Sequence, residues 1–296
     1  MKIFDCFMYF DEEQVLDLRL NVLNDFVDYF VIVESTQNHK GIKRELLFDQ
    51  SKFQKFKNKI IYLVYDEQPK NIELVSENDS HSEKSIKYIL NAALRENGQR
   101  DFIVNGLDNA DKDDFILISD VDEIPNLSKI DFNSINEKIL MFQQEMFYYK
   151  FDLKLPDVIW SGTKGCKKKN LESPQWLRNI KDRKYNFFRF DTFFSKTKYM
   201  NIKIIDNGGW HFTNLKNAKE IEYKLKSYLH HREFDVNPIS SDEIKKIMND
   251  KIAIYDLSLD KRTQKIGHGK KLQKYSLEKL PKFLQNNIVN YQEWID

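Results

Sequence analysis

The first two-fifths of the chain alternate apolar segments with segments of helical periodicity, which restricts the possible folds strongly. The apolar segments are rich in β-branched and aromatic residues, as buried strands are. They comprise residues 2–9, 29–34, 59–65 and 115–119. Between the first two, leucines recur at the spacing of one helical face. Apolar strands separated by helices predict parallel strand–helix–strand units, with helices on both faces of one central sheet.

Between the third and fourth apolar segments we expect a long helix at residues 83–107, interrupted at Gly98. The later part of the chain is less regular, with a strand expected at residues 139–153 that crosses to a second sheet. Residues 160–183 are rich in Lys, Gly and Asn and predict a mobile loop. A further strand is expected at residues 185–190.

The expected fold class is α/β, as a single Rossmann-type domain with a mostly parallel central sheet and C-terminal helical additions. Residues 218–229 predict a helix, and the Lys-rich, amphipathic residues beyond 240 predict the additions. We therefore expect a main domain at residues 1–240 and a helical extension at residues 241–296 that packs on it.

Composition excludes several classes of protein. The chain has 47 Lys plus Arg against 46 Asp plus Glu. A net charge this close to zero gives no overall attraction to a polyanion, so no nucleic-acid partner is expected. No stretch of 18 apolar residues predicts a membrane span, and the N-terminus lacks the features of a secretory signal. Cys6 and Cys166 are too few for a disulfide framework, so a reducing, cytoplasmic location is expected.

The sharpest local signal is ISDVDEIP at residues 118–125, directly after the fourth apolar segment. Ligands of parallel sheets bind beyond the carboxyl ends of the strands. Alternate residues of an extended chain face the same way, so Asp120 and Asp122 are expected to converge. Converging carboxylates repel one another unless a cation such as Mg²⁺ or Mn²⁺ lies between them. The alternative is a solvated acidic turn, which the apolar strand before it and Pro125 after it disfavour.

A second signal is DNGGWH at residues 206–211. Gly208 and Gly209 allow unusual backbone angles and the close approach of a ligand. Trp210 beside His211 is a common pairing in sugar sites, and the imidazole of His211 is a possible ligand of the same metal. The alternatives are a hydrogen-bonded structural histidine and a core tryptophan.

These segments resemble glycosyltransferase family 17, which includes the β-1,4-mannosyl-glycoprotein β-1,4-N-acetylglucosaminyltransferases. The resemblance spans about residues 3–235 and rests on an ordered set of segments. They are residues 4–36, 99–107, 113–125, 160–162, 207–212 and 223–234. It implies a GT-A-like fold, a UDP-sugar donor and inversion at the anomeric carbon. In such enzymes Asp120 and Asp122 hold Mn²⁺ or Mg²⁺ against the donor diphosphate, and His211 completes the metal site.

The remaining site residues follow from the same comparison and from residue chemistry. Arg100 offers a planar fork suited to phosphate, although an exposed helix charge is an equally simple interpretation. Lysines at residues 167–169, in a segment that is either a lid or a solvated loop, are a further source of positive charge. The residues expected at the donor are Phe7, Glu34, Arg100, Asp120, Trp160, Gly208, Gly209 and Trp210.

An inverting transfer needs one carboxylate as general base to accept the proton of the acceptor hydroxyl. Asp206 is the first candidate, followed by Glu123 and Glu145. The resemblance implies N-acetylglucosamine as the transferred sugar. Because the sequence carries no recognisable N-terminal anchor, the expected acceptor is a bacterial or viral surface glycan rather than a core N-glycan.

Two other functions are compatible with parts of the pattern. A phosphatase of the haloacid dehalogenase type also carries Asp-x-Asp after an apolar strand, with Asp120 as nucleophile and Asp122 as acid. In that class the motif follows the first strand, whereas here it follows the fourth. A non-catalytic glycan-binding module is the second alternative, and the presence of all three metal-ligand candidates disfavours it.

Overall fold

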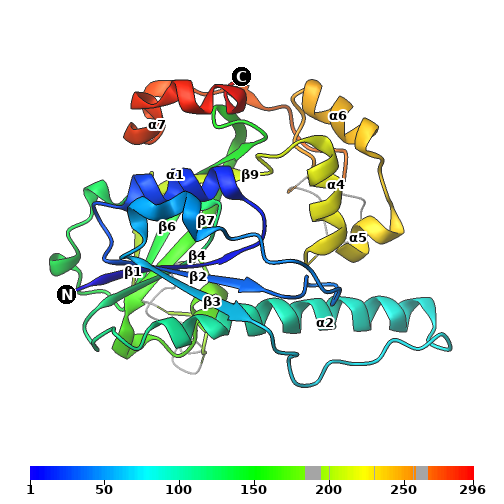
Figure 1. Ribbon diagram of the computed structural model, residues 1–296, viewed down its shortest axis with the longest axis horizontal. Coiled ribbons are helices and arrows are strands. Elements are labelled where there is room, and N and C mark those ends of the chain that lie inside the picture. Colours follow the sequence, from blue (N-terminus) through cyan, green and yellow to red (C-terminus); the bar gives the residue numbers. More distant parts are fainter. Residues whose placement is uncertain (184–194, 200, 230, 256, 258–265) are drawn as a thin grey trace.

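The fold is a mixed α/β structure built on one curled, mostly parallel sheet, seen in a computed structural model (Figure 1). The structure describes residues 1–183, 195–199, 201–229, 231–255, 257 and 266–296. The sheet path is β3-β2-β1-β4-β7-β6-β9-β5, with β8 paired to β6 and β10 to β7. The strands are β1 (Ile3–Tyr9), β2 (Tyr29–Ser35), β3 (Ile60–Tyr65), β4 (Phe115–Asp120), β5 (Glu123–Pro125), β6 (Ile139–Tyr148), β7 (Leu153–Lys167), β8 (Ile202–Ile205), β9 (Gly209–Thr213) and β10 (Gln273–Lys274).

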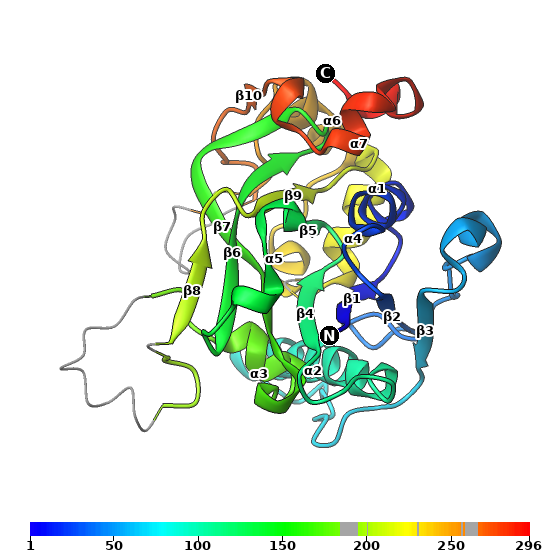
Figure 2. The ribbon, with the colours of Figure 1, turned by 90° about the vertical axis from the view of Figure 1, so that its left-hand side faces the viewer.

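Helices cover both faces of this sheet, as the alternating pattern predicts. The α-helices are α1 (Glu13–Leu23), α2 (His81–Asp101), α3 (Pro174–Asn179), α4 (Ala218–Ser227), α5 (His231–Val236), α6 (Ser241–Asn249) and α7 (Lys282–Asn286). Helices α1 and α7 lie on one face, and α2 and α3 lie on the other (Figure 2). Within the described residues, no helix combines the length and apolar character that a membrane crossing requires.

The four predicted parallel strands are confirmed, and they order as β3-β2-β1-β4 with every pairing parallel. The near-continuous burial of β1, β2 and β4 explains why these three strands are apolar without alternation, whereas β3 at the edge of the sheet is only partly buried. Helix α1 ends at Leu23, and α2 continues through Gly98, where an interruption was expected, to Asp101. A capping box between Ser80 and Glu83 starts α2 at its N-terminus.

The second half of the sheet differs from the sequence prediction. Strand β6 does not cross to a second sheet but pairs with β7, β8 and β9 in the same one. The prediction of a mobile loop at residues 160–183 is wrong, because β7 extends to Lys167 and α3 follows it. Tertiary pairing with β4 and β6 stabilises this Lys- and Gly-containing strand. The strand expected at residues 185–190 lies outside the described residues.

The C-terminal residues pack into the same core as the N-terminal strands. Leu280, Leu284 and Tyr291 are buried in a cluster that also contains Leu16 and Phe30. Helices α4 and α5 lie beyond the carboxyl ends of β1 to β3 (Figure 1). This arrangement places the end of the parallel strands opposite a helical wall.

Candidate active site

A cavity of about 390 Å³ lies at the carboxyl ends of the parallel strands. Its floor comes from the residues that follow β1, β2 and β4, and α4 supplies the opposite wall. Polar and aromatic side chains line much of this cavity. They include Tyr9, Glu12, His39, Glu96, Asp120, Asp122, Trp160, His211 and Lys224. This is the position at which open α/β sheets bind ligands.

Pairing of β5 with β9 brings the two predicted motifs together. In this antiparallel pair, Glu123 lies opposite His211 and Pro125 lies opposite Gly209. Gly209 has φ +137°, and a Cβ atom there would lie 2.1 Å from the carbonyl oxygen of Ile124. A glycine is therefore required for the strand to approach the acidic turn this closely.

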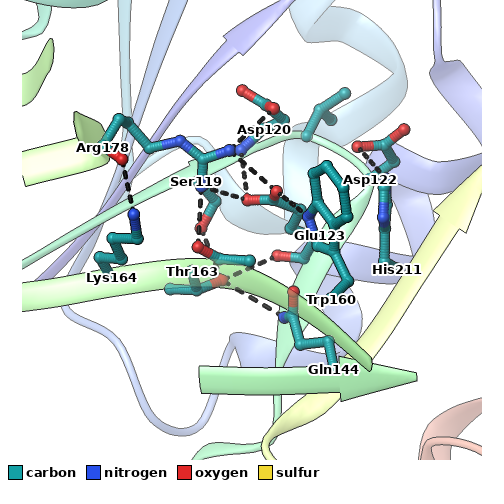
Figure 3. Close-up of polar contacts among 12 residues, drawn as sticks. Ser119, Asp120, Asp122, Glu123, Gln144, Trp160, Thr163, Lys164, Arg178 and His211 are labelled. Atoms are coloured by element: carbon teal, nitrogen blue, oxygen red, sulfur yellow. Dashed lines mark hydrogen bonds and ion pairs between the residues drawn. The ribbon is translucent and has the colours of Figure 1, made fainter. Parts of the chain in front are cut away.

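Asp122 and His211 face one another across this pairing, and both line the cavity (Figure 3). The Oδ1 atom of Asp122 lies 3.4 Å from Nε2 of His211. Burial alone lowers the pKa of His211, but the negative charge of Asp122 outweighs it and the pKa is raised. The Trp160 ring packs against the imidazole, with 5.1 Å between ring centroids.

Asp120 points to a different set of partners. Its Oδ1 accepts a hydrogen bond from Arg100 at 2.9 Å, and its Oδ2 accepts one from Arg178 at 3.1 Å. Burial opposes ionisation, but the guanidinium charges of Arg178 and Arg100 hold the pKa of Asp120 well below its ordinary value. Both oxygens of this carboxylate are therefore engaged by fixed cations.

Glu123 is fully buried beneath the turn and takes part in a dense set of contacts (Figure 3). Its carboxylate accepts from both terminal nitrogens of Arg178, at 2.7 and 2.9 Å, and from Nε1 of Trp160 at 2.7 Å. The backbone N–H of Asp120 also donates to it. A carboxylate held in this way orients the turn and Trp160 and does not face the cavity as a general base.

The turn is held from the opposite side by Arg19 of α1. Its Nη1 donates to the carbonyl oxygens of Asp120, Val121 and Glu123, at 3.2, 3.2 and 2.7 Å. Its other nitrogens donate to both carboxylate oxygens of Asp5, and both side chains are fully buried. This pair fixes the backbone that carries the acidic motif.

The residues present fit a divalent ion held by Asp122 and His211. A separation of 3.4 Å between a carboxylate oxygen and an imidazole nitrogen suits two ligands of one ion. Among the described residues there is no ready-made group of three such ligands, and Asp120 is engaged by arginines. Ions such as Mg²⁺ are commonly bound by one or two carboxylates and complete their shell with water and substrate phosphates, so Asp122 would be the main protein ligand, with His211 beside it.

Several predicted site residues lie away from the cavity. Glu34 is fully buried, where it binds Arg44, Tyr62 and the backbone N–H groups of Leu47 and Phe48. Phe7 lies in the core under the guanidinium of Arg19. Trp210 is half-buried and donates to the carbonyl oxygen of Lys279. Gly208 is buried against the backbone of Phe142 and Gln143. These four residues position strands and loops and do not line the cavity.

The first and third candidates for the general base are also placed elsewhere. Asp206 is exposed in the turn after β8, and Glu145 on β6 forms an ion pair with Lys154 at 2.5 Å. Neither lines the cavity. Lys168 binds the carbonyl oxygens of Leu107 and Ala110 near the start of β4, so the lysines at 167–169 lie at the opposite end of that strand from Asp120.

Three residues at the site were not identified from the sequence. Arg178 and Lys224 lie in segments that gave no chemical signal of their own, although Lys224 falls within the resembling segment 223–234. Arg19 was not singled out because an arginine within a helix is ordinarily a solvent-exposed charge, and the sequence does not show that this one is buried. His39, which follows β2, also lines the cavity.

Comparison with models of protein families matches residues 1–295, almost the whole chain, to glycosyltransferase family 17. A search of curated proteins finds no match.

Proposed function

The chain belongs to glycosyltransferase family 17, and from this membership we propose that it is an inverting, metal-dependent enzyme of GT-A type. In this proposal it transfers N-acetylglucosamine from a UDP-sugar to a hydroxyl group of a glycan. Family membership itself supports glycosyltransferase activity with a sugar donor and a glycan acceptor. The observation that carries the finer proposal is the Asp122–His211 pair on the wall of the cavity.

The donor is proposed to lie with its nucleoside over the ends of β1 and β2 and its diphosphate at Asp122. Tyr9 and His39 line the first region, and Nδ1 of His39 is buried without a hydrogen-bond partner, so it can bind a polar group of a ligand. When a divalent ion is bound at Asp122 and His211, it stabilises the negative charge that develops on the departing diphosphate. The side chain of Asp120, fixed by Arg100 and Arg178, keeps the turn in place.

The acceptor hydroxyl must lose its proton as it attacks the anomeric carbon. Because Asp206 and Glu145 lie outside the cavity and Glu123 is buried, the proton acceptor is proposed to be another carboxylate on the wall. Glu12 and Glu96 both line the cavity. Replacement of each by Gln, followed by measurement of transfer and of UDP binding, separates a base from a binding group.

The test of this function is thermal unfolding with UDP and a panel of UDP-sugars, with and without Mn²⁺. A ligand that binds only the folded state raises the melting temperature. We expect a Mn²⁺-dependent increase that is largest for UDP-N-acetylglucosamine, followed by UDP release when a suitable glycan is added. Absence of any shift with nucleotides, together with hydrolysis of an aryl phosphate, would instead indicate the phosphatase alternative.

A further inference from the structure

Lys224 brings a positive charge to the cavity from the helical wall. It lies on α4, whose first turn is fixed by a capping box between Asn217 and Glu220. Its Nζ lies 3.4 Å from Oε1 of Glu12 and 4.0 Å from Oδ2 of Asp122. The side chain is only 19% exposed, so its position is set by packing and by these two carboxylates.

Three arginines near the cavity, in the part of the chain that the structure describes, have closer partners than Lys224 has. Arg178 and Arg100 each donate to Asp120 at 3.1 Å or less. Arg44 donates to the carbonyl oxygens of Ser35 and Phe10. Lys224 makes longer contacts than these, so a ligand that offers a better acceptor can attract its ammonium group at lower cost.

Asp122 stands between the imidazole of His211 and the ammonium group of Lys224. Its Oδ1 faces His211 and its Oδ2 faces Lys224. Burial alone lowers the pKa of Lys224, but the charges of Glu12 and Asp122 outweigh it and raise the pKa, so the ammonium is charged at neutral pH. An ion that binds Asp122 therefore competes with Lys224 for the same carboxylate.

We propose that Lys224 is the counter-ion of Asp122 before ligands bind and a ligand of the donor diphosphate afterwards. This inference rests on the proposed function and assigns Lys224 two successive partners. When a divalent ion neutralises Asp122, the ammonium loses its attraction to that carboxylate. The diphosphate, held next to the same ion, then offers it anionic oxygens within the cavity.

The inference predicts opposite effects on two ligands, which a purely structural lysine would not produce. In Lys224→Met, Mn²⁺ alone should bind about threefold to tenfold more tightly, because a competing charge has been removed. UDP at saturating Mn²⁺ should bind about tenfold more weakly, because one charged hydrogen-bond donor is lost. Free Mn²⁺ is measured by electron paramagnetic resonance and UDP binding by calorimetry.

Two variants serve as controls. Lys224→Arg keeps the charge and should stay close to wild type for Mn²⁺. Lys226→Met removes a charge from the same helix, where the side chain is 51% exposed and paired with Glu222, and should leave both affinities unchanged. Thermal unfolding establishes that each variant is folded. If Lys224→Met does not fold, Lys224→Gln takes its place in both measurements.

The outcomes separate this inference from the function on which it rests. Wild-type protein that binds neither Mn²⁺ nor UDP overturns the proposed function, and the role of Lys224 falls with it. Wild-type protein that binds both, with a Lys224→Met variant whose Mn²⁺ affinity is unchanged or weaker, overturns the role of Lys224 alone. Unchanged UDP affinity in that variant overturns it equally.

Discussion

Nη1 of Arg19 lies 2.7 Å from the carbonyl oxygen of Glu123, so a side chain of the first helix holds the turn that carries the acidic motif. These residues are 104 positions apart in the sequence. Asp5 neutralises the guanidinium from the neighbouring strand, at 2.6 Å. The geometry of the candidate metal site therefore depends on a buried ion pair that does not itself face the cavity.

Breaking this pair on one side should cost more than removing it altogether. Arg19→Met leaves the Asp5 carboxylate buried without its partner and should destabilise the fold by about 3–5 kcal/mol. The double variant Asp5→Asn/Arg19→Met should be less unstable than the sum of the single changes. Urea unfolding measures all four free energies, and simple additivity would show that the two side chains act independently.

Removing one partner of the ion pair between Arg178 and Glu123 should also destabilise the fold. Arg178→Met leaves a fully buried glutamate without its bidentate partner, so we expect a loss of about 3–5 kcal/mol in the free energy of unfolding. The control is Lys169→Met, which removes an exposed ion pair with Asp113 and should cost less than about 1 kcal/mol. Equal effects of the two changes would contradict the structural role given to Arg178.

Gly209 is required for two reasons: its φ is positive, and backbone atoms lie where a Cβ atom would be. Gly267, which shares only the first feature, allows us to distinguish them. Gly209 and Gly267 both have positive φ, +137° and +84°. A Cβ atom at Gly209 would lie 2.1 Å from a backbone oxygen, whereas at Gly267 the nearest atom within range is 3.8 Å away. Gly267→Ala should therefore cost about 1 kcal/mol and Gly209→Ala several. Similar melting temperatures for the two variants would rule out the close approach of β9 to the acidic turn.

Asp122 should be essential for metal-dependent binding. Asp122→Asn leaves His211 as the remaining protein ligand of the proposed pair, so the Mn²⁺-dependent increase in melting temperature with UDP should be lost. Asp113→Asn, a change in an exposed carboxylate before β4, is the matched control and should keep the increase. A wild-type response from the Asp122 variant would remove this residue from the metal site.

Lys164 gives a pH dependence whose sign is fixed by its surroundings. Burial, followed by the charge of Arg178, lowers its pKa to about 8, while its Nζ donates to the carbonyl oxygens of Arg178 and Ile180. The pKa of a lysine in the unfolded chain is about 10.4. Between these two values the unfolded chain binds more protons, so this lysine makes the protein more stable as pH rises through that window.

The measurement compares wild type with Lys164→Met by urea unfolding at about pH 7 and about pH 10. The difference in free energy of unfolding between the two proteins should shift in favour of wild type at the higher pH. Taking the difference between the free energies of unfolding of wild type and variant removes the contribution of other groups that titrate in this range. A difference that stays constant with pH would mean that Lys164 has an ordinary pKa in the folded protein.

The candidate site was predictable in part. Asp122 and His211 are in contact distance, as expected for two members of one site, and Asp120 and Trp160 line the same cavity. Glu34 was expected to meet the nucleoside because it ends a strand, but its side chain turns inward to bind Arg44 and Tyr62. Position at a strand end predicts proximity to a site, and it does not predict the direction of the side chain.

What the sequence by itself determined is the local order of the fold. Runs of β-branched and aromatic residues specified the four parallel strands, and the position of the acidic motif after β4 indicated the sheet edge at which the cavity lies. The tertiary structure alone decided the chemistry available to each carboxylate. Glu123 is buried and Asp122 faces the cavity because β9, Arg19 and Arg178 arrive from distant parts of the chain. Contacts across such separations depend on strand pairing and helix packing, which leave no periodic signal in the sequence.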